Sequence, residues 1–458
     1  MYRVTIGLEI HAELKTRTKM FCGCKNDPDE KSPNFNVCPV CMAHPGALPV
    51  INKQAVRSVL RVGAALSGKV SDYTRFDRKN YFYPDIPKGY QISQYEHPLV
   101  QGGSLKGVSI TRIHLEEDTA RSQHSGDKSL VDFNRAGVPL MELVTEPQIR
   151  SAAEAGAFAR ELQLLLRYVG AGEANMEKGE MRVEANISMG ENGKIGTKVE
   201  IKNLNSFRSV ERAILYEIER QSGLLEHGEK VEQETRGWDD TTQKTFSQRK
   251  KEFSHDYRYF PDPDLPYLRI GEISEFSEEN LKKELPELPW QRRERYMELG
   301  LKKDDADMFV RDSVYGDFFD EICKGLSSEG ISLAANYIAN DLAGQGKTAD
   351  SGNFRKLITM VLEGRLSSRG AKDTLALMFA DGRDPEVLAK EKGLVQQSDE
   401  SALATIAQKV IAGYPDVAKD YKAGKEVALQ FLIGKGMMES KGSANPQALR
   451  EAIQKILA

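Results

Sequence analysis

Hydrophobic and polar residues alternate strictly over residues 4–13, and this period of two predicts a β-strand with one buried face. The apolar residues occupy the even positions. The opposite face carries Thr5, Gly7, Glu9, His11 and Glu13. Two carboxylates and an imidazole on one strand face are unusual for a strand that merely meets solvent, and such a row could hold a divalent metal ion. An ordinary exposed polar face is the alternative.

A second alternating segment, residues 110–118, extends this hypothesis. If it is extended, Glu117 lies on one face, and the other face carries Arg112, His114, Glu116 and Asp118. Adjacent acids repel one another unless water, an arginine or a cation neutralises them. With Glu9 and His11 they could bind Mg²⁺, although histidine is a less usual Mg²⁺ ligand. His11 would then orient a bound water, or Mn²⁺ would take the site.

The remaining patterns divide the chain into three parts. Helical periodicity predicts helices over 151–168 and 206–221, and alternation predicts a hairpin from 181–188 and 197–202. Two prolines in residues 285–290 mark a boundary, beyond which the pattern is helical. We therefore expect an α+β protein: a β-rich domain with inserted helices over 1–290, an all-α domain over 291–397, and a small α-helical tail over 398–458 with three short helices.

Composition limits the protein class. The chain has 458 residues, of which 40% are hydrophobic, and a formal net charge of −4, so nucleic-acid contacts must come from local basic patches. It has no apolar run near the length of a membrane span, and its first residues do not resemble a signal peptide. Five cysteines in a chain this long do not make a disulfide framework. We expect a cytoplasmic protein without a membrane partner.

Four of the cysteines form two close pairs separated by a loop: Cys22, Cys24, Cys38 and Cys41. This spacing suits a tetrahedral four-sulfur zinc site, although the first pair is C-x-C where C-x-x-C is commoner. Four unrelated buried thiols and a redox pair are the alternatives. A site closed by four sulfurs leaves no open position, so we interpret the zinc as a structural staple.

A basic and aromatic run covers residues 75–93. Lys79 and Lys88 could neutralise phosphates, while Tyr81 and Tyr83 could stack on a base or line a pocket. A surface loop held by aromatic packing is the alternative.

Eight segments together resemble the B subunit of the aspartyl/glutamyl-tRNA amidotransferase. They are spread over nearly the whole chain, and they are Ile6–Leu14, Phe76–Asp85, Gln91–Gln94, Glu116–Asp118, Asp132–Arg135, Lys202–Ser206, Asp256–Pro261 and Lys441–Pro446.

The resemblance implies a cradle domain with a kinase-like site, a helical domain, and a tail that contacts tRNA. It implies a heterotrimer with an A subunit, an amidase that releases ammonia from glutamine, and a small C subunit. The chain would act as a glutamine-hydrolysing carbon–nitrogen ligase. It would use ATP to phosphorylate the side-chain carboxylate of Glu or Asp misattached to tRNA(Gln) or tRNA(Asn), and channelled ammonia would displace the phosphate.

The resemblance also implies roles for single residues. As Mg²⁺-site and catalytic residues it suggests Glu9, His11, Glu116 and Glu117. As nucleotide-pocket residues it suggests Lys79, Tyr81, Tyr83 and Lys88. Glu184, Glu200 and Lys202, on facing hairpin strands, would line the site or the ammonia tunnel.

Two other functions compete with this one. A zinc-stapled tRNA-binding adaptor would bind tRNA without hydrolysing a nucleotide, but facing carboxylates oppose phosphates unless a metal ion intervenes. A metal-dependent hydrolase built on Glu9, His11 and Glu116 would act without ATP.

Overall fold

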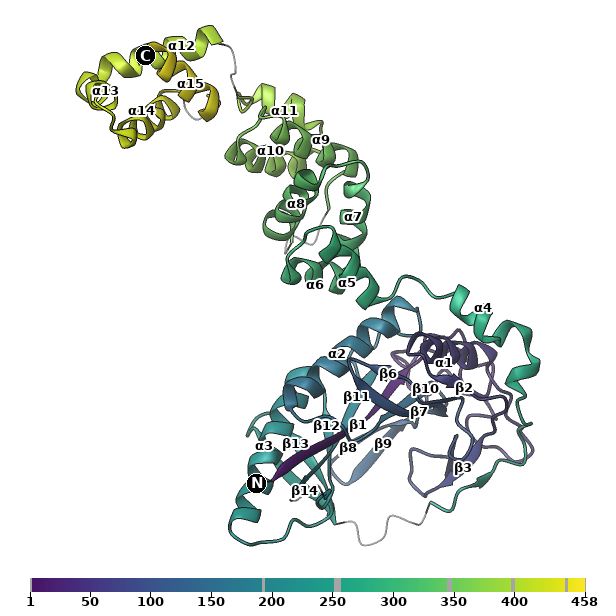
Figure 1. Ribbon diagram of the computed structural model, residues 1–458. Helices are drawn as coiled ribbons and strands as arrows, with labels where there is room; N and C mark the ends of the chain where they lie inside the picture. The colour runs from purple at the N-terminus through teal and green to yellow at the C-terminus, as the bar shows by residue number, and fades with distance from the viewer. Residues whose placement is uncertain are drawn as a thin grey trace. The chain divides into compact units, whose positions relative to one another are not determined.

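The computed structural model describes residues 2–191, 194–250, 257–343, 348–396, 400–440 and 444–457. These residues pack into two compact units, Met1–Pro289 and Trp290–Ala458 (Figure 1). Each unit has its own buried hydrophobic residues. The first unit combines sheets with helices, and the second is helical. The predicted α+β class is confirmed.

The first unit is built on a ten-stranded mixed sheet within the described part of the chain, with the order β14-β13-β12-β11-β1-β10-β7-β5-β2 and with β6 beside β7. Strands β12 and β13 pair in parallel, and the other pairs are antiparallel. The strands are β1 (Arg3–Glu13), β2 (Lys69–Val70), β5 (Val100–Gln101), β6 (Ser104–Leu105), β7 (Val108–Glu117), β10 (Pro139–Thr145), β11 (Met181–Gly190), β12 (Val199–Leu204), β13 (Glu234–Asp239) and β14 (Lys244–Lys250).

Two smaller sheets accompany the large one. A three-stranded sheet has the order β15-β3-β4, from β15 (Phe260–Pro261), β3 (Asp77–Asn80) and β4 (Tyr90–Ser93). A two-stranded hairpin is formed by β8 (Arg121–Ser125) and β9 (Lys128–Asp132).

Helices cover the large sheet. Helix α2 (Ala152–Tyr168) packs against α3 (Phe207–Glu226), which lies on β11 and β12, and Figure 1 shows both helices on the same side of the sheet. Helix α1 (Lys53–Ala65) packs on β7 and against the short α4 (Glu278–Lys283). Two 3₁₀ turns, Ile270–Glu272 and Ser274–Phe276, precede α4.

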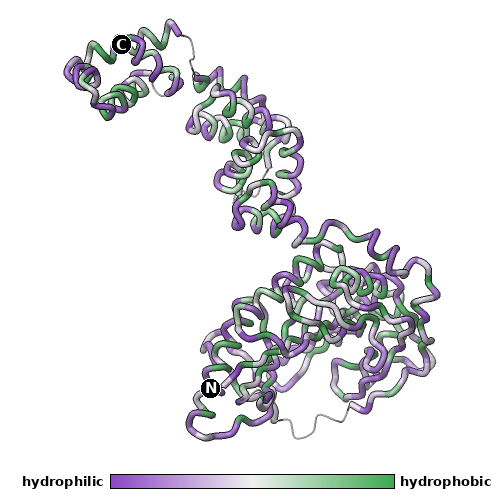
Figure 2. The backbone as a smooth tube through the Cα atoms, viewed as in Figure 1, coloured by the Kyte–Doolittle hydropathy of each residue, from purple (hydrophilic) through white to green (hydrophobic). Residues whose placement is uncertain are grey.

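The predicted elements of this unit form. Ser151 caps α2 by accepting a hydrogen bond from the backbone N–H of Glu154, and β11 pairs with β12 as the predicted hairpin. Helix α3 runs five residues beyond the predicted end, to Glu226. Strand β1 buries its even positions from Ile6 to Ala12, as its alternation predicts. Figure 2 shows hydrophobic and hydrophilic residues interspersed along the chain.

In the second unit, buried aromatic rings pack between the first three helices. Tyr296, Phe309 and Phe319 pack with ring centroids 4.6–6.0 Å apart. The helices before the tail are α5 (Pro289–Glu298), α6 (Lys303–Arg311), α7 (Ser313–Cys323), α8 (Ser328–Tyr337), α9 (Ser351–Leu362), α10 (Ser368–Asp381) and α11 (Pro385–Glu391). A π-helical turn, Ile338–Leu342, follows α8.

The tail contains four helices in its described residues, where the sequence pattern predicted three. They are α12 (Glu400–Gly413), α13 (Pro415–Lys422), α14 (Glu426–Glu439) and α15 (Pro446–Leu457). Pro415 starts α13 at a position where a proline suits the first turn, so it separates two helices whose apolar patterns otherwise join. Leu403, Leu432 and Leu449 bring three of these helices to one core. Among the described residues, we find no helix with the length and apolar character needed to cross a membrane.

Candidate active site

Polar side chains lie side by side across the middle of the large sheet. His11 of β1 pairs with Arg182 of β11 on one side and with Glu142 of β10 on the other. Glu142 in turn pairs with His114 of β7. Residues directly opposite one another in antiparallel strands project to the same face. The row therefore occupies the sheet face opposite to the apolar side chains of β1.

His11 lies at the centre of a group of acids. Its Nε2 atom lies 3.3 Å from Oε1 of Glu116, 3.3 Å from Oε2 of Glu142 and 4.0 Å from Oε1 of Glu9. Burial disfavours the charged imidazole, but hydrogen bonds with Glu116 and Glu142 outweigh it and raise the pKa of His11 well above its usual value. Without a bound metal ion, these two carboxylates therefore favour the protonated imidazole.

Glu142 is a buried acid that faces both histidines. Its side chain is 6% exposed, Oε2 lies 3.5 Å from Nε2 of His114, and Arg112 donates to Oε1 at 3.4 Å. Burial opposes its charge, yet His114, His11 and nearby Lys79 hold the pKa of Glu142 below its ordinary value. Glu142 is therefore a buried carboxylate whose charge the neighbouring side chains stabilise.

Glu9 extends the group toward β11 and β12. Burial, and then repulsion from Glu142 and Glu184, raises the pKa of Glu9 to about 7. Lys202 donates to Glu184 at 3.0 Å, and its Nζ atom lies 3.8 Å from Oε1 of Glu200. Burial opposes the charge of Lys202, but these two acids raise its pKa. Lys202 therefore supplies a positive charge at the end of the acid cluster nearest to Glu9 and Glu184.

The segment Gln91–Gln94 fixes the end of β7 that carries the acids. Gln91 donates to the backbone carbonyl of Glu117 at 2.7 Å, and Gln94 accepts from the backbone N–H of Leu115 at 3.0 Å. Ser93 donates to Glu116 at 3.4 Å. The same motif thus positions both Glu116 and its neighbour.

A cavity of about 400 Å³ opens over the acids. Its floor comes from the large sheet and includes Glu9, His114 and Glu142. Its other wall comes from the β15-β3-β4 region and is aromatic and basic: Lys79, Tyr95, Tyr257 and Tyr259. This volume and polarity suit a small anionic ligand.

Two protein-domain models match this chain: the GatB/GatE catalytic domain over residues 4–274 and the GatB domain over residues 317–457. The chain belongs to the GatB family. It is 44% identical over 482 residues to the B subunit of the aspartyl/glutamyl-tRNA(Asn/Gln) amidotransferase of Carboxydothermus hydrogenoformans, and 43% identical over 478 residues to that of Persephonella marina. The identity to the Thermotoga maritima protein of the same name is 44% over 482 residues. Each comparison covers 100% of this chain and 99% of the relative.

This GatB-family chain has two overlapping groups of donors that could hold metal ions. Glu9, His11 and Glu142 form one group, and His114, Glu116 and Glu142 form the other. Within each group the donor atoms lie within 4.8 Å of one another. A set of carboxylates with an imidazole suits Mg²⁺ or Mn²⁺ better than it suits a soft metal ion.

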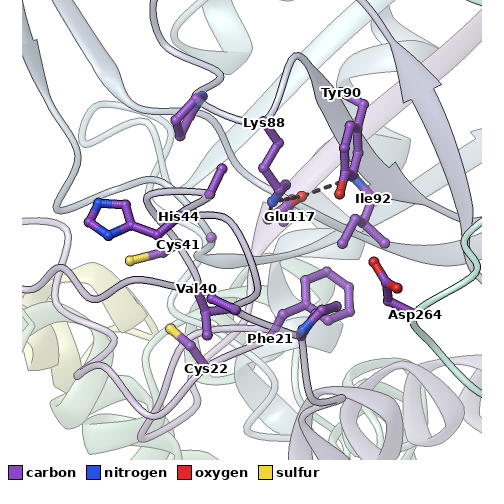
Figure 3. A pocket seen from close by; sticks show the side chains of 15 residues that line it. Phe21, Cys22, Val40, Cys41, His44, Lys88, Tyr90, Ile92, Glu117 and Asp264 are labelled. Atoms are coloured by element: carbon purple, nitrogen blue, oxygen red, sulfur yellow. Dashed lines mark hydrogen bonds and ion pairs between the residues drawn. The ribbon is translucent and has the colours of Figure 1, made fainter.

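The structure separates two residues that the sequence grouped with this site. Lys88 and Glu117 form an ion pair, and the backbone N–H of Ile92 donates to Glu117 at 2.9 Å. The pair lines a different pocket, of about 210 Å³, and Figure 3 shows Cys41 and His44 of the cysteine loop on its far side. Glu117 therefore points away from the cluster that Glu116 forms with His11, as expected for neighbours on a strand.

Three further residues were predicted to line a nucleotide pocket, and two of them lie in or beside the large cavity. Lys79 lines the cavity, and its Nζ atom lies 5.1 Å from the ring centroid of Tyr257. Tyr81 packs edge-on against Tyr257 and Tyr83, with centroids 6.1 Å apart in each pair. Tyr83 is 60% exposed. The structure thus joins Lys79 and Tyr81 to the aromatic wall and leaves Tyr83 outside it.

Asp118 continues the acidic face of β7 but does not contact His11 in the described contacts. It pairs instead with Arg135, and Arg182 donates to both of its oxygens at 3.1 Å. Burial opposes its charge, but Arg182 and Arg135 lower the pKa of Asp118. This acid fixes two arginines beside the cluster.

The four loop cysteines lie together, with their sulfur atoms within 4.8 Å of one another. Sγ of Cys41 lies 3.8 Å from Sγ of Cys38, and the backbone N–H of Cys38 points to Sγ of Cys41 at 3.1 Å. A hydrogen bond with Cys22 lowers the pKa of Cys41 to about 5. Four sulfurs at this spacing, one of them disposed to ionise, could hold a structural metal ion.

Glu142 was not predicted as a site residue, and His114 had no predicted role. The signal for Glu142 was present: it is an acid inside the otherwise apolar run 138–144. A carboxylate in a fully buried strand requires partners, so such a residue marks a polar site on its face. His114 shares its strand face with Glu116, and only the register shows that it meets Glu142.

Proposed function

We propose that this chain is the component of a tRNA-dependent amidotransferase that activates the amino acid. It would transfer the γ-phosphoryl group of ATP to the side-chain carboxylate of Glu or Asp misattached to tRNA(Gln) or tRNA(Asn). Ammonia would then attack the acyl carbon, phosphate would leave with the C–O bonding electrons, and loss of a proton would give the amide. The carboxylate is activated first because oxide is a poor leaving group.

The single observation that carries the proposal is the buried acid cluster around His11, facing a cavity that also holds cations. Phosphoryl transfer depends on positioning and on charge stabilisation more than on covalent help from the protein. Lys79, Arg112 and Lys202 line the cavity and would offer positive charge to phosphate oxygens. A pure tRNA-binding adaptor would have no use for carboxylates facing that ligand.

The cofactors follow from the donor sets. Glu9, Glu116 and Glu142 would hold Mg²⁺ or Mn²⁺ together with His11, which would lose its proton as the metal ion binds. The bound ion would supply charge neutralisation for the phosphates. The four loop cysteines would hold structural Zn²⁺. ATP is the phosphoryl donor in this proposal, with Lys79 and Tyr81 near its binding position and with Tyr83, Lys88 and Glu117 farther from it than the sequence suggested.

Ammonia would come from a partner. The amidase, which is the A subunit of the complex, would release it from glutamine, and the small C subunit would complete the heterotrimer. Glu184, Glu200 and Lys202 form a polar wall at one end of the cluster, and two of them line the cavity. They would guide ammonia on its way to the acyl phosphate.

The division of labour would follow the chain. Residues 1–290 would form the catalytic cradle, residues 291–397 a helical domain, and residues 398–458 a tail that contacts tRNA. The reaction would take place in the cytoplasm, where aminoacyl-tRNA is made and used.

The test measures ADP release by the complex purified with its A and C subunits, with and without Glu-tRNA(Gln). The variants are Glu9→Gln and Glu142→Gln, and the control is Glu146→Gln, whose carboxylate bonds to Thr111 outside the cluster. We expect ADP release that requires the misacylated tRNA. We expect a loss of about 100-fold or more in both cluster variants, because a ligand for the charged centre is removed.

The outcomes separate the competing functions. Release of ADP that both cluster variants leave unchanged would place the phosphoryl-transfer site elsewhere. Binding of tRNA without any release of ADP would favour the adaptor, and activity without ATP would favour a hydrolase.

A further inference from the structure

Two tyrosines from distant parts of the chain stack face to face at the cavity. The rings of Tyr95 and Tyr259 lie with centroids 4.3 Å apart and an interplanar angle of 13°. Both side chains line the cavity that holds Glu9 and Glu142. Tyr95 is nevertheless 57% exposed, so a large part of its ring is uncovered at the mouth of that cavity.

The backbone holds the exposed ring in a defined place. The buried carboxylate of Asp77 accepts hydrogen bonds from the backbone N–H groups of Tyr95, at 3.1 Å, and of Glu96, at 3.4 Å. Arg75 donates to the other oxygen of Asp77 at 3.1 Å, which fixes that carboxylate. An exposed aromatic ring with such an anchor loses little conformational freedom when a ligand stacks on it.

Tyr259 is anchored from the opposite direction. It comes directly before β15, which pairs with β3, and the next residue, Phe260, lies opposite Arg78. Asn80 donates from its side chain to the backbone carbonyls of Tyr257 and Arg258, at 3.2 and 2.7 Å. The stacked pair is therefore a rigid platform that joins the two ends of the three-stranded sheet.

The position of this platform selects its ligand. The reaction proposed above brings two adenosines to the cavity, that of ATP and the 3′-terminal nucleoside that carries the amino acid. A small ligand such as ATP is largely enclosed in its site, whereas the polynucleotide must leave the cavity toward solvent. A half-exposed ring on the wall of the cavity that also holds the acids suits the nucleoside whose chain continues outward. Base stacking on tyrosine is sequence-tolerant and effective.

We propose that the Tyr95–Tyr259 pair stacks against the adenine of the 3′-terminal adenosine of the aminoacylated tRNA and so directs the side-chain carboxylate to the acid cluster. The inference rests on the proposed function for the identity of the substrate. Its residues belong to the binding of tRNA and not to the phosphoryl-transfer chemistry.

The first experiment is steady-state kinetics of the complex with its A and C subunits, using Glu-tRNA(Gln) and ATP. Tyr95→Ala is expected to raise the KM for Glu-tRNA(Gln) by roughly 5- to 100-fold, with kcat and the KM for ATP near their wild-type values. Tyr95→Phe keeps the ring and is expected to behave as wild type. A rise in the KM for ATP alone would overturn the assignment, because it would give the platform to the nucleotide.

A matched control comes from a second pair of tyrosines on the same unit. Tyr267 is 62% exposed and packs against Tyr73 with centroids 6.0 Å apart, away from the catalytic cavity. Tyr267→Ala removes a comparable ring and is expected to leave both KM values unchanged. If it raises the KM for Glu-tRNA(Gln) as much as Tyr95→Ala does, the effect does not belong to the platform and the proposal is wrong.

The second experiment measures equilibrium binding of uncharged tRNA(Gln) to the same complex, with the 3′ end either complete (CCA) or lacking the terminal adenosine (CC). The wild type is expected to bind the CC form more weakly, and Tyr95→Ala is expected to bind both forms equally. An unchanged preference for CCA in Tyr95→Ala would sink the proposal. This measurement needs no catalysis, so it tests the platform even if the complex proves not to phosphorylate the amino acid.

Discussion

A charged side chain buried in a sheet is stable only where neighbouring groups replace the hydrogen bonds and charge stabilisation that water would give. The His11 cluster shows this replacement for a histidine and two of its three acids. His11 contacts Glu116 and Glu142 at 3.3 Å, which favours the charged forms of all three groups. Glu9 lies farther away, at 4.0 Å, and gains less from the imidazole than it loses through burial and repulsion. The cluster thus carries one acid that the apo protein destabilises and that a bound cation would stabilise.

Glu9 therefore makes stability depend on pH. The unfolded chain loses this proton near pH 4.3, whereas the folded chain holds it up to about pH 7. The folded state binds the extra proton between these values, so the free energy of unfolding falls as the pH rises through this window. In magnesium-free buffer, we expect Glu9→Gln to stabilise the chain by about 1–3 kcal/mol at pH 8 and by less at pH 5. Urea denaturation at the two pH values measures this, and an equal gain at both would contradict it.

At the scale of the element, alternation is a strong guide because a strand side chain has only two directions. It predicted β1, β7 and the β11–β12 hairpin, and it put Glu116 and Glu117 on opposite faces. The pairing of distant strands is a different matter. That β1 lies between β10 and β11, and that His11 therefore meets Glu142, depends on register, which local patterns do not encode.

The same limit explains the site residues that sequence reasoning placed differently. Lys79 and Lys88 lie on one basic run, and nothing local shows that one faces the cavity and the other a pocket beside the cysteine loop. Tyr95 and Tyr259 lie 164 positions apart and meet only because β15 pairs with β3. The additional tail helix was missed for a local reason: a proline at the first turn divides one apolar pattern into two helices.

The cysteine loop is an element whose role can be tested separately from the chemistry. Cys38→Ser removes one of the four clustered sulfurs that would hold the proposed zinc. We expect a lower zinc content and a melting temperature lower by several degrees, because a metal cross-link would be lost. Turnover per folded molecule should stay similar, since the acid cluster faces a different cavity. Zinc content, thermal unfolding and tRNA-dependent ADP release measure these effects. Cys323→Ser in α7 is the control. A large loss of turnover in folded, zinc-free protein would show that the cysteine loop has more than a structural role.

At the scale of the whole molecule, Glu9 in the first unit and Asp320 in the second make stability depend on pH in opposite directions. In the first unit, the raised pKa of Glu9 means that acid removes a destabilising charge. In the second, Asp320 of α7 accepts hydrogen bonds at 2.7 Å from Arg292 and at 2.8 Å from Arg295, both on α5. Burial opposes its charge, but these arginines lower the pKa of Asp320. Acid therefore removes a stabilising charge there.

Asp320→Asn tests this second dependence. We expect it to destabilise the helical unit by about 1.5–3 kcal/mol at neutral pH, the usual worth of hydrogen bonds to charged groups. The stabilisation from Asp320 is complete above its unfolded pKa near 3.9 and is lost as the pH falls through the lower folded value, so the variant and the wild type should converge in acid. Hydrogen exchange of α5 and α7 measures the effect.

Asp317→Asn is the matched control: Asp317 also bonds to Arg292, at 2.7 Å, but its side chain is 73% exposed and should contribute much less. If both variants lose the same free energy of unfolding, the prediction is wrong, because the strength of these ion pairs would then not depend on how exposed the carboxylate is.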